Sequence, residues 1–349
     1  MPDSAAALER IASIVGPRGV VAHADAAPLL RDERGLYQGA AALVVRPASV
    51  EECAGVVRVC HDARIGVVPQ GGNTSYCGGA TPFDDPWKSL EGDGERRQIL
   101  LSLSRLNRVR EVDAIGFTMT TEAGVVLARA QEAARAANLL FPLSMGSEGS
   151  AQIGGNLATN AGGLAVLRYG TMRELVLGLE VVLPNGDVLS ELKGLRKDNT
   201  GYDSKALFLG SEGTLGVITA AVLKLFPEPR SRATAWLAVA SIDAACALLG
   251  RARRESGDQV VSAEYVSRRS LDLVLRHVDG ARDPLGSPAE HYVLLELSSA
   301  DADERLRATL ERVLATGLAD GEILDGTIAE SEAQRRALWL LRERVPEAE

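Results

Sequence analysis

The chain has 349 residues, enough for about two domains, with a hydrophobic fraction of 46% and a charged fraction of 24%. These fractions are those of an ordinary folded protein, and the net charge of −9 argues against nucleic acid or an anionic membrane as the main partner. No apolar run approaches the roughly 20 residues of a transmembrane segment. The N-terminal segment 1–16 lacks the basic region of a signal peptide, so we expect an amphipathic helix there and a cytoplasmic protein.

Strands and helices alternate through the first part of the chain. Ser49, followed by two glutamates, predicts the N-terminus of a helix that runs to residue 63. The apolar spacing of residues 125–137 predicts a second helix. We predict strands at residues 41–46, 65–68, 98–103 and 118–122.

A long apolar strand is predicted at residues 171–183. The sequence PNGD at 184–187 is a hairpin turn signal, so residues 188–192 should return antiparallel. Another strand is predicted at 217–226. Two prolines around Glu228 then end this strand, and we predict domains at residues 1–227 and 228–349.

The second domain is predicted to alternate regularly between strands and helices. The strands are expected at residues 233–240, 260–266, 292–298 and 322–327. The helices are expected at residues 243–255, 268–276, 301–318 and 331–344. This order with short connections is typical of a split βαβ, ferredoxin-like layer.

Two glycine-rich segments follow predicted structure in the first domain. The segment Ser144–Gly163 has six glycines and few bulky side chains, and PQGGNTSYCGG at Pro69–Gly79 is of the same kind. Glycine lets backbone N–H groups approach a large polar ligand closely, so the pair predicts a nucleotide-type cofactor held from two sides. Neither segment is a phosphate loop with Gly-Lys-Ser/Thr or a GxGxxG fingerprint. The alternative is that Pro69–Gly79 is a glycine-rich turn and Ser144–Gly163 is a long surface loop, without a ligand.

A third segment, residues 195–219, has Gly210, Gly213 and Gly216 before a predicted strand. Glu212 in it could orient backbone amides or meet a ribose hydroxyl. Lys197, Asp198 and Tyr202 could equally form a structural polar network.

Cysteine and histidine give no sign of a metal site. The four cysteines show no CxxC spacing, and the four histidines form no HxH or HExxH pair. We expect reduced thiols that are buried or unreactive. The positions are Cys53, Cys60, Cys77, Cys246, His23, His61, His277 and His291.

Several longer motifs carry a resemblance that covers roughly residues 40–346. They read RPASVEE, PQGGNTS, GSEGSAQIGGNLATNAGGLAVLRYG, LGLEVVLPNGDVL, LRKDNTGYD, LFLGSEGTLGVIT and WLLRERVPEA. Together they resemble the flavin domain of the vanillyl-alcohol-oxidase superfamily, and within it the FAD-linked D-2-hydroxyacid dehydrogenases. GGNTS and LRKDNTGYD are more similar to the 2-hydroxyglutarate group than to the glycolate oxidase group.

The resemblance implies an α+β fold. A PCMH-type FAD-binding domain of two α+β subdomains would be followed by a partial ferredoxin-like cap domain. The implied activity is oxidation of a D-2-hydroxyacid, with D-2-hydroxyglutarate as the first candidate, by hydride transfer to flavin N5. D-lactate or glycolate oxidation on the same scaffold is the alternative, and a non-catalytic FAD-binding fragment is the alternative from another class.

The resemblance also assigns cofactor residues. The first segment would wrap the pyrophosphate, the second would line the ribityl and ring portion, and the third would contact the adenosine half. Relatives that attach FAD covalently use a histidine in the first segment, where this chain has none, so we expect non-covalent FAD. The implied residues are Pro69, Gly71, Gly72, Asn73, Thr74, Ser75, Gly78, Gly146, Ser150, Gly154, Gly155, Asn156, Thr159, Asn160, Gly163, Gly213, Gly216 and Ile218.

Arg342 matches the family's arginine for the substrate carboxylate, while Pro346 stands where the family can carry threonine. The family's substrate lysine, its divalent-metal ligands (for Zn, for example) and its proton-accepting histidine come later than Glu349. We therefore expect no metal site in this chain, and we expect the chain alone to be inactive. An electron-transfer flavoprotein or quinone is the expected electron acceptor, and a homodimer stays open.

Overall fold

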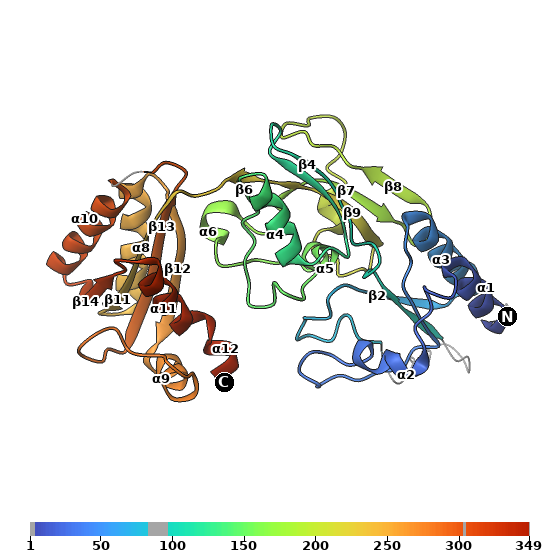
Figure 1. The fold of residues 1–349 in the computed structure, drawn as a ribbon, viewed down its shortest axis with the longest axis horizontal. Coiled ribbons are helices and arrows are strands. Elements are labelled where there is room, and N and C mark those ends of the chain that lie inside the picture. The colour runs from blue at the N-terminus through green and yellow to red at the C-terminus, as the bar shows by residue number, and fades with distance from the viewer. Residues whose placement is uncertain (1–3, 83–96, 303–304, 349) are drawn as a thin grey trace. The chain divides into compact units, whose positions relative to one another are not determined.

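The computed structural model describes residues 4–82, 97–302 and 305–348 (Figure 1). The chain divides into two compact units. The first comprises Met1–Gly162 and Thr171–Phe226, and the second comprises Gly163–Gly170 and Pro227–Glu349. The division after Phe226 lies next to the predicted domain boundary. Residues 163–170 pack with the second unit although both of their flanking segments belong to the first.

The first unit begins with a parallel sheet of three strands in the order β1-β3-β2. The strands are β1 (Leu43–Val45), β2 (Gly66–Gln70) and β3 (Gln98–Ser102). Helices α1 (Ser4–Val15) and α3 (Val50–Ala63) pack against each other and share one hydrophobic core with this sheet.

Helix α3 has the N-terminus that its sequence predicts. The Ser49 hydroxyl accepts a hydrogen bond from the Glu52 N–H at 3.2 Å, which satisfies one of the free donors of the first turn. Arg64 ends the helix in the left-handed conformation, with φ of 55°. Between these ends, Cys53 and Val56 lie on the fully buried face.

A second, antiparallel sheet of five strands in the order β4-β5-β9-β7-β8 completes the first unit. Gly186 has φ of +81° in the turn between β7 and β8, which confirms the predicted hairpin. Arg58 of α3 pairs with Asp187 of this turn at 3.0 Å. The strands are β4 (Val109–Asp113), β5 (Thr118–Glu122), β7 (Val176–Val182), β8 (Val188–Glu191) and β9 (Val217–Lys224).

An ionic network with two buried carboxylates crosses this five-stranded sheet. Arg110 bridges Glu122 at 3.3 Å and Glu180 at 3.1 Å, and the Thr219 hydroxyl donates to Glu180 at 3.0 Å. Burial opposes ionisation of Glu122, but hydrogen bonds from Arg108 and the charges of both arginines outweigh it. The pKa of Glu122 therefore lies below its ordinary value.

The second unit is a four-stranded antiparallel sheet in the order β12-β13-β11-β14. Its strands are β11 (Ser231–Val239), β12 (Val260–Ser267), β13 (His291–Ser299) and β14 (Ile323–Ile328). Strand β13 lies between β11 and β12, and β11 lies between β13 and β14. Both βαβ crossovers are therefore split by an antiparallel strand, which confirms the ferredoxin-like layer.

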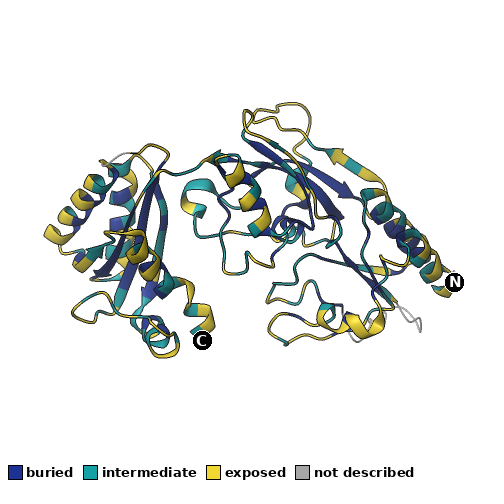
Figure 2. Cartoon of the chain, viewed as in Figure 1, coloured by how far each residue is buried: buried dark blue, intermediate teal, exposed yellow. Residues whose placement is uncertain are grey.

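Helices cover both faces of this second sheet. Helices α8 (Ile242–Ser256) and α10 (Arg305–Ala319) share one core with it. On the other face, α9 (Arg268–His277) and α11 (Glu332–Glu343) enclose Trp236 and its neighbours. Figure 2 shows the sheet as a buried layer between helices whose outer faces are exposed.

Shorter elements connect these layers, and the structure differs from the sequence-based prediction in two places. The second glycine segment contains a helix, α5, where a loop was predicted. Residues 171–175 form turns, so β7 begins five positions later than the strand predicted from residue 171. The shorter elements are α2 (His23–Ala26), η1 (Ala27–Leu29), α4 (Leu127–Ala136), β6 (Leu139–Leu140), α5 (Ile153–Ala158), α6 (Val166–Tyr169), α7 (Lys205–Phe208), β10 (Phe226–Pro227) and α12 (Val345–Ala348).

The late start of β7 has a local cause. The Glu174 carboxylate accepts hydrogen bonds from both the N–H and the hydroxyl of Thr171, at 2.7 and 2.6 Å. The Thr171 hydroxyl also lies 3.0 Å from the Asn160 side-chain oxygen. These bonds hold the chain in a turn, which a run of apolar residues does not reveal.

Candidate functional site

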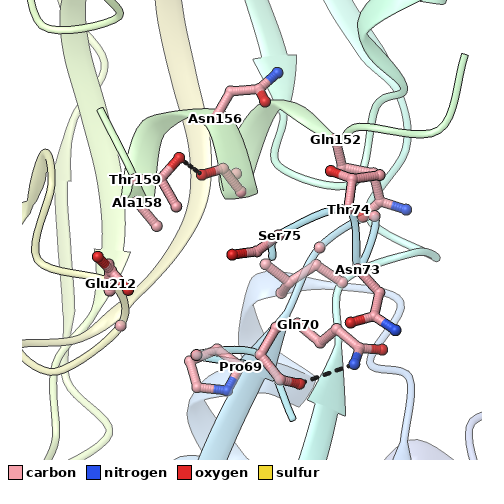
Figure 3. Close-up of a pocket in the computed structure, with 18 of the residues that line it drawn as sticks. Pro69, Gln70, Asn73, Thr74, Ser75, Gln152, Asn156, Ala158, Thr159 and Glu212 are labelled. Atoms are coloured by element: carbon pink, nitrogen blue, oxygen red, sulfur yellow. Dashed lines mark hydrogen bonds between the residues drawn. The ribbon is translucent and has the colours of Figure 1, made fainter. Parts of the chain in front are cut away.

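The two glycine-rich segments meet in one cavity of the first unit, which we call the glycine cleft. Its volume is about 270 Å³, and residues of three segments line it: 69–80, 145–161 and 212–218, with Leu103 beneath them. Figure 3 shows Pro69, Gln70 and Ser75 on one side, and Asn156, Thr159 and Glu212 across from them.

The glycines bring the first two segments into contact. A Cβ at Gly72 would lie 2.1 Å from the Ser150 carbonyl oxygen, and one at Gly71 would lie 3.2 Å from the Gly155 nitrogen. No larger residue fits at Gly72 without moving backbone. The close approach of these backbones therefore depends on glycine.

The loop after β2 presents free backbone donors. The N–H groups of Gly71 through Ser75 donate to no backbone oxygen among the described residues. Asn73 has φ of 54°, and its side chain anchors the loop by donating to the Arg31 carbonyl at 2.7 Å. Successive free N–H groups around a left-handed residue suit an anion such as a pyrophosphate.

Three side chains of the glycine cleft have buried polar atoms without a partner among the described residues. They are Oε1 of Gln70, Oε1 of Gln152 and Nδ2 of Asn156. The other end of Gln70 is fixed, because its Nε2 donates to the carbonyls of Leu29 and Ala80 at 2.8 and 2.9 Å. A buried polar atom without a partner is costly, so these atoms fit a polar ligand in the cleft.

Helix α5 lies in the second lining segment of the glycine cleft, residues 145–161. A Cβ at Gly154 would lie 2.7 Å from the Ala123 Cβ, so this glycine faces the protein interior. A Cβ at Gly155 would meet nothing within 4 Å, and Gly155 lines the cleft. The Thr159 hydroxyl donates to the Gly155 carbonyl at 2.9 Å. Gly155 thus leaves open space where a ligand can lie.

The third lining segment, residues 212–218, begins with the carboxylate side chain of Glu212. Glu212 has φ of 52°, and its N–H donates to the Ala158 carbonyl at 2.9 Å. Among the described residues that line the cleft, Glu212 alone has a formal charge. A Cβ at Gly213 would lie 2.6 Å from the Pro69 Cγ, so the third lining segment packs closely against the first. A carboxylate in this position can accept a hydrogen bond from a hydroxyl group.

Thirteen of the eighteen cofactor residues implied by the sequence line the glycine cleft. They are Pro69, Gly71, Gly72, Asn73, Thr74, Ser75, Gly154, Gly155, Asn156, Thr159, Gly213, Gly216 and Ile218.

The other five, Gly78, Gly146, Ser150, Asn160 and Gly163, do not line it. Gly78 has φ of +72°, so it serves its own turn. Ser150 meets Gly72 through its backbone oxygen. The Asn160 side-chain oxygen accepts hydrogen bonds from within the first unit, and Gly163 begins the segment that packs with the second.

Gln70, Gln152 and Met145 line the cleft but were not among the residues predicted from the sequence. Gln70 stands within the PQGG motif and Gln152 within SAQIGG, so their place in the glycine-rich segments could have indicated them as lining residues. The sequence could not show that one end of Gln70 is fixed to carbonyl groups distant in the chain.

Arg342 lies in the second unit, on α11. Its Nε donates to the Glu264 carboxylate of β12 at 2.6 Å. No hydrogen bond from its two terminal nitrogens to another described residue is found. Such an arginine can still offer both terminal N–H groups to a planar carboxylate. Pro346 lies in α12.

Across the residues that the structure describes, no three His, Cys, Asp or Glu side chains come together as ligands for a metal ion. Within residues 4–82, 97–302 and 305–348, no helix combines the length and apolar character needed to cross a bilayer.

The free N–H groups, the unpaired buried polar atoms and the glycine-lined space define a protein that binds a phosphate-containing cofactor. Comparison with known families identifies the cofactor. Residues 41–190 match the FAD binding domain, and residues 228–349 match the C-terminal domain of FAD linked oxidases. The chain belongs to the family of FAD-linked oxidases that these two domains define.

Several similar curated proteins are named as D-2-hydroxyglutarate dehydrogenases. The "probable D-2-hydroxyglutarate dehydrogenase, mitochondrial" of Oryza sativa subsp. indica is 37% identical over 338 residues, covering 96% of this chain and 58% of that protein. A Bos taurus protein named "D-2-hydroxyglutarate dehydrogenase, mitochondrial" is 38% identical, covering 99% of this chain and 60% of that one. The chain thus spans less than two thirds of the length of these relatives.

Solved structures share the fold. An alkyldihydroxyacetonephosphate synthase superposes with a TM-score of 0.74 at 18% identity, covering 97% of this chain and 63% of that one. A p-cresol methylhydroxylase superposes with a TM-score of 0.73 at 17% identity, covering 98% and 71%. These likenesses confirm the PCMH-type FAD-binding fold.

Proposed function

We propose that this chain is the FAD-binding domain and part of the substrate domain of a D-2-hydroxyacid dehydrogenase. D-2-hydroxyglutarate is the proposed substrate, in agreement with the names of the relatives. The observation that carries the cofactor assignment is the set of unpaired buried polar atoms in the glycine cleft. When bound there, FAD supplies a flavin ring that accepts the hydride from C2 of the hydroxyacid.

The residues of the chain would divide the work of holding the cofactor. The free N–H groups of the loop from Gly71 to Ser75 would bind the pyrophosphate, and Glu212 would accept from a ribose hydroxyl. The unpaired Nδ2 of Asn156 would donate a hydrogen bond to a polar edge of the cofactor, and the unpaired Oε1 of Gln152 would accept one. The cleft would also exclude water from these bonds, which strengthens them.

Arg342 is the proposed partner of the substrate carboxylate. Glu264 holds its Nε, so the terminal nitrogens stay available for a bidentate pair. A base for the hydroxyl proton is not assigned to any residue of this chain.

The cofactor proposal is tested with the purified chain and FAD. We expect saturable FAD binding and, since the first loop has no histidine, full release of the flavin when the protein is precipitated with acid. Flavin that stays in the pellet would contradict non-covalent binding. A chain that binds no FAD at all would contradict the whole assignment.

The substrate proposal is tested in two preparations. Anaerobic addition of D-2-hydroxyglutarate to the FAD-loaded 349-residue chain should leave the flavin oxidised. Rapid loss of its visible absorbance would mean that the 349-residue chain suffices for catalysis. A version extended to the length of the relatives should be reduced fastest by D-2-hydroxyglutarate, when D-lactate, glycolate and D-malate are compared with it. Faster reduction by another of these acids would replace the proposed substrate.

The remaining assignments belong to the same proposal. The cytoplasm is the proposed compartment, supported by four cysteines without a disulfide. An electron-transfer flavoprotein or a quinone is the proposed electron acceptor, and a homodimer is the proposed assembly. Light scattering of the extended protein measures its mass and decides between a monomer and a dimer.

A further inference from the structure

The first unit contains a second cavity, which we call the cationic pocket. It has a volume of about 340 Å³ and lies between the start of β7, the end of β9 and the loop that joins β8 to α7. It shares no lining residue with the glycine cleft. Five basic side chains line it: Arg173, Lys193, Arg196, Lys205 and Lys224.

Two of these five cations are neutralised by carboxylates of the same pocket. Lys193 pairs with Asp198 at 3.3 Å, and Lys205 pairs with Asp203 at 2.6 Å. The third carboxylate of the lining, Glu191, accepts a hydrogen bond from the Ser204 hydroxyl. Glu191 keeps its negative charge, because a neutral hydroxyl does not compensate it, so the five basic and three acidic side chains give the lining a net charge of +2.

The other three cations have no carboxylate partner among the described residues. Arg173 donates only to two backbone carbonyls, at 2.9 and 2.6 Å. Arg196 also donates to backbone carbonyls, one of them at 3.1 Å. No hydrogen bond from the Lys224 ammonium group to another described residue is found. The pocket thus has a net positive charge of +2 in a chain whose net charge is −9.

The surroundings of Lys224 make this arrangement unfavourable without a counterion. Its side chain is partly buried, and burial lowers its pKa. The positive charges of Arg196 and Lys205 lower the pKa of Lys224 further, and Glu174 acts in the opposite sense. The Glu174 carboxylate is itself bonded to Thr171. Like charges in a partly desolvated cavity repel, and a bound anion would remove this repulsion.

We propose that the cationic pocket binds a small oxoanion with at least two negative charges, either a phosphate or a polycarboxylate. Lys224 is its point-charge partner, and Arg173 and Arg196 add positive charge from the pocket walls. This site is separate from the FAD-binding site and does not depend on the proposed activity.

The test uses the 349-residue chain saturated with FAD, so that the glycine cleft cannot take the probe. Inorganic phosphate and citrate are titrated separately by calorimetry, with sodium chloride at matched ionic strength as the blank. Lys224→Met removes the charge and keeps an unbranched apolar side chain. Lys197→Met is the matched control, because Lys197 lies on the same loop and does not line the pocket.

We expect saturable binding of at least one probe with one site per chain. Lys224→Met should weaken it about 10-fold or more, and Lys197→Met should leave it unchanged. Circular dichroism checks that each variant is folded, and Lys224→Gln replaces the methionine variant if that one fails to fold. Absence of saturable binding for both probes, or equal weakening by the two lysine variants, would overturn the proposal.

Discussion

Replacing Gly155 by leucine should abolish FAD binding while leaving the chain folded. The new side chain would begin in open space, because a Cβ at this position meets nothing within 4 Å. It would extend into a cleft of about 270 Å³ that the cofactor must enter. We expect a loss of at least about 3 kcal/mol in binding, or more than about 100-fold in Kd.

The stability of the folded chain should change in the other direction or not at all. Gly155 lies inside α5, and glycine in a helix is less favourable than leucine by about 0.5–1 kcal/mol. Exposure of an apolar side chain in the empty cleft offsets part of this gain. The free energy of unfolding without FAD should therefore stay within about 1 kcal/mol of the original chain.

Two neighbouring glycines provide matched controls. Gly149→Leu adds the same side chain in open space outside the cleft, so FAD affinity and stability should both be retained. Gly154→Leu would press on Ala123, only 2.7 Å from the new Cβ, and should destabilise the fold by about 1–3 kcal/mol or more.

Quenching of FAD fluorescence measures the Kd, and urea unfolding followed by circular dichroism measures stability. If folded Gly155→Leu binds FAD with the original Kd, the cofactor does not occupy the glycine cleft. If Gly149→Leu loses FAD equally, the effect does not come from the cleft.

Four further results are expected. In a protein extended to the length of the relatives, Arg342→Ala should lower kcat/KM by about 30- to 4,000-fold, for a lost charge-assisted pair of roughly 2–5 kcal/mol. Glu264→Gln should mainly raise KM, and an unchanged KM would show that Glu264 does not position Arg342. Burial raises the pKa of Cys53 and Cys60 to about 12, and the charge of a nearby glutamate contributes at Cys53. A thiol reagent should therefore label two cysteines of the folded chain quickly and all four only after unfolding. Because the pKa of Glu122 is lowered from 4.5, its stabilisation is present above pH 4.5 and is lost as the pH falls through the lower folded value. Glu122→Gln should therefore cost about 2 kcal/mol near neutral pH and flatten the acid limb of the stability profile, and an unchanged profile in urea titrations would contradict this.

Much of the architecture could be read from local sequence. The Ser49 cap and the PNGD hairpin lie where their residues predict, because caps and tight turns depend on side chains only a few positions apart. The ferredoxin-like layer also follows from the regular alternation of elements after Pro227.

Where the local rules failed, contacts between distant residues were responsible. The turn at Thr171 replaced a predicted strand because Glu174 and Asn160 bind its hydroxyl. Helix α5 lies inside a glycine-rich segment, where the N–H groups of its first residues, Ile153 and Gly154, donate to the carbonyls of Val125 and Ala123. Propensity alone disfavours a helix there.

The sequence by itself determined the kind of ligand, since its glycine-rich motifs could be matched to an FAD-binding family. Only the tertiary structure decided which residues face that ligand. Gly154 and Gly155 are adjacent in the sequence and both line the cleft, yet a Cβ at Gly154 would meet Ala123 and one at Gly155 would meet open space. Likewise, no local pattern pairs Arg342 with Glu264 or gathers uncompensated charges around Lys224. Side-chain direction and charge compensation depend on elements far apart along the chain, and the fold alone brings these elements together.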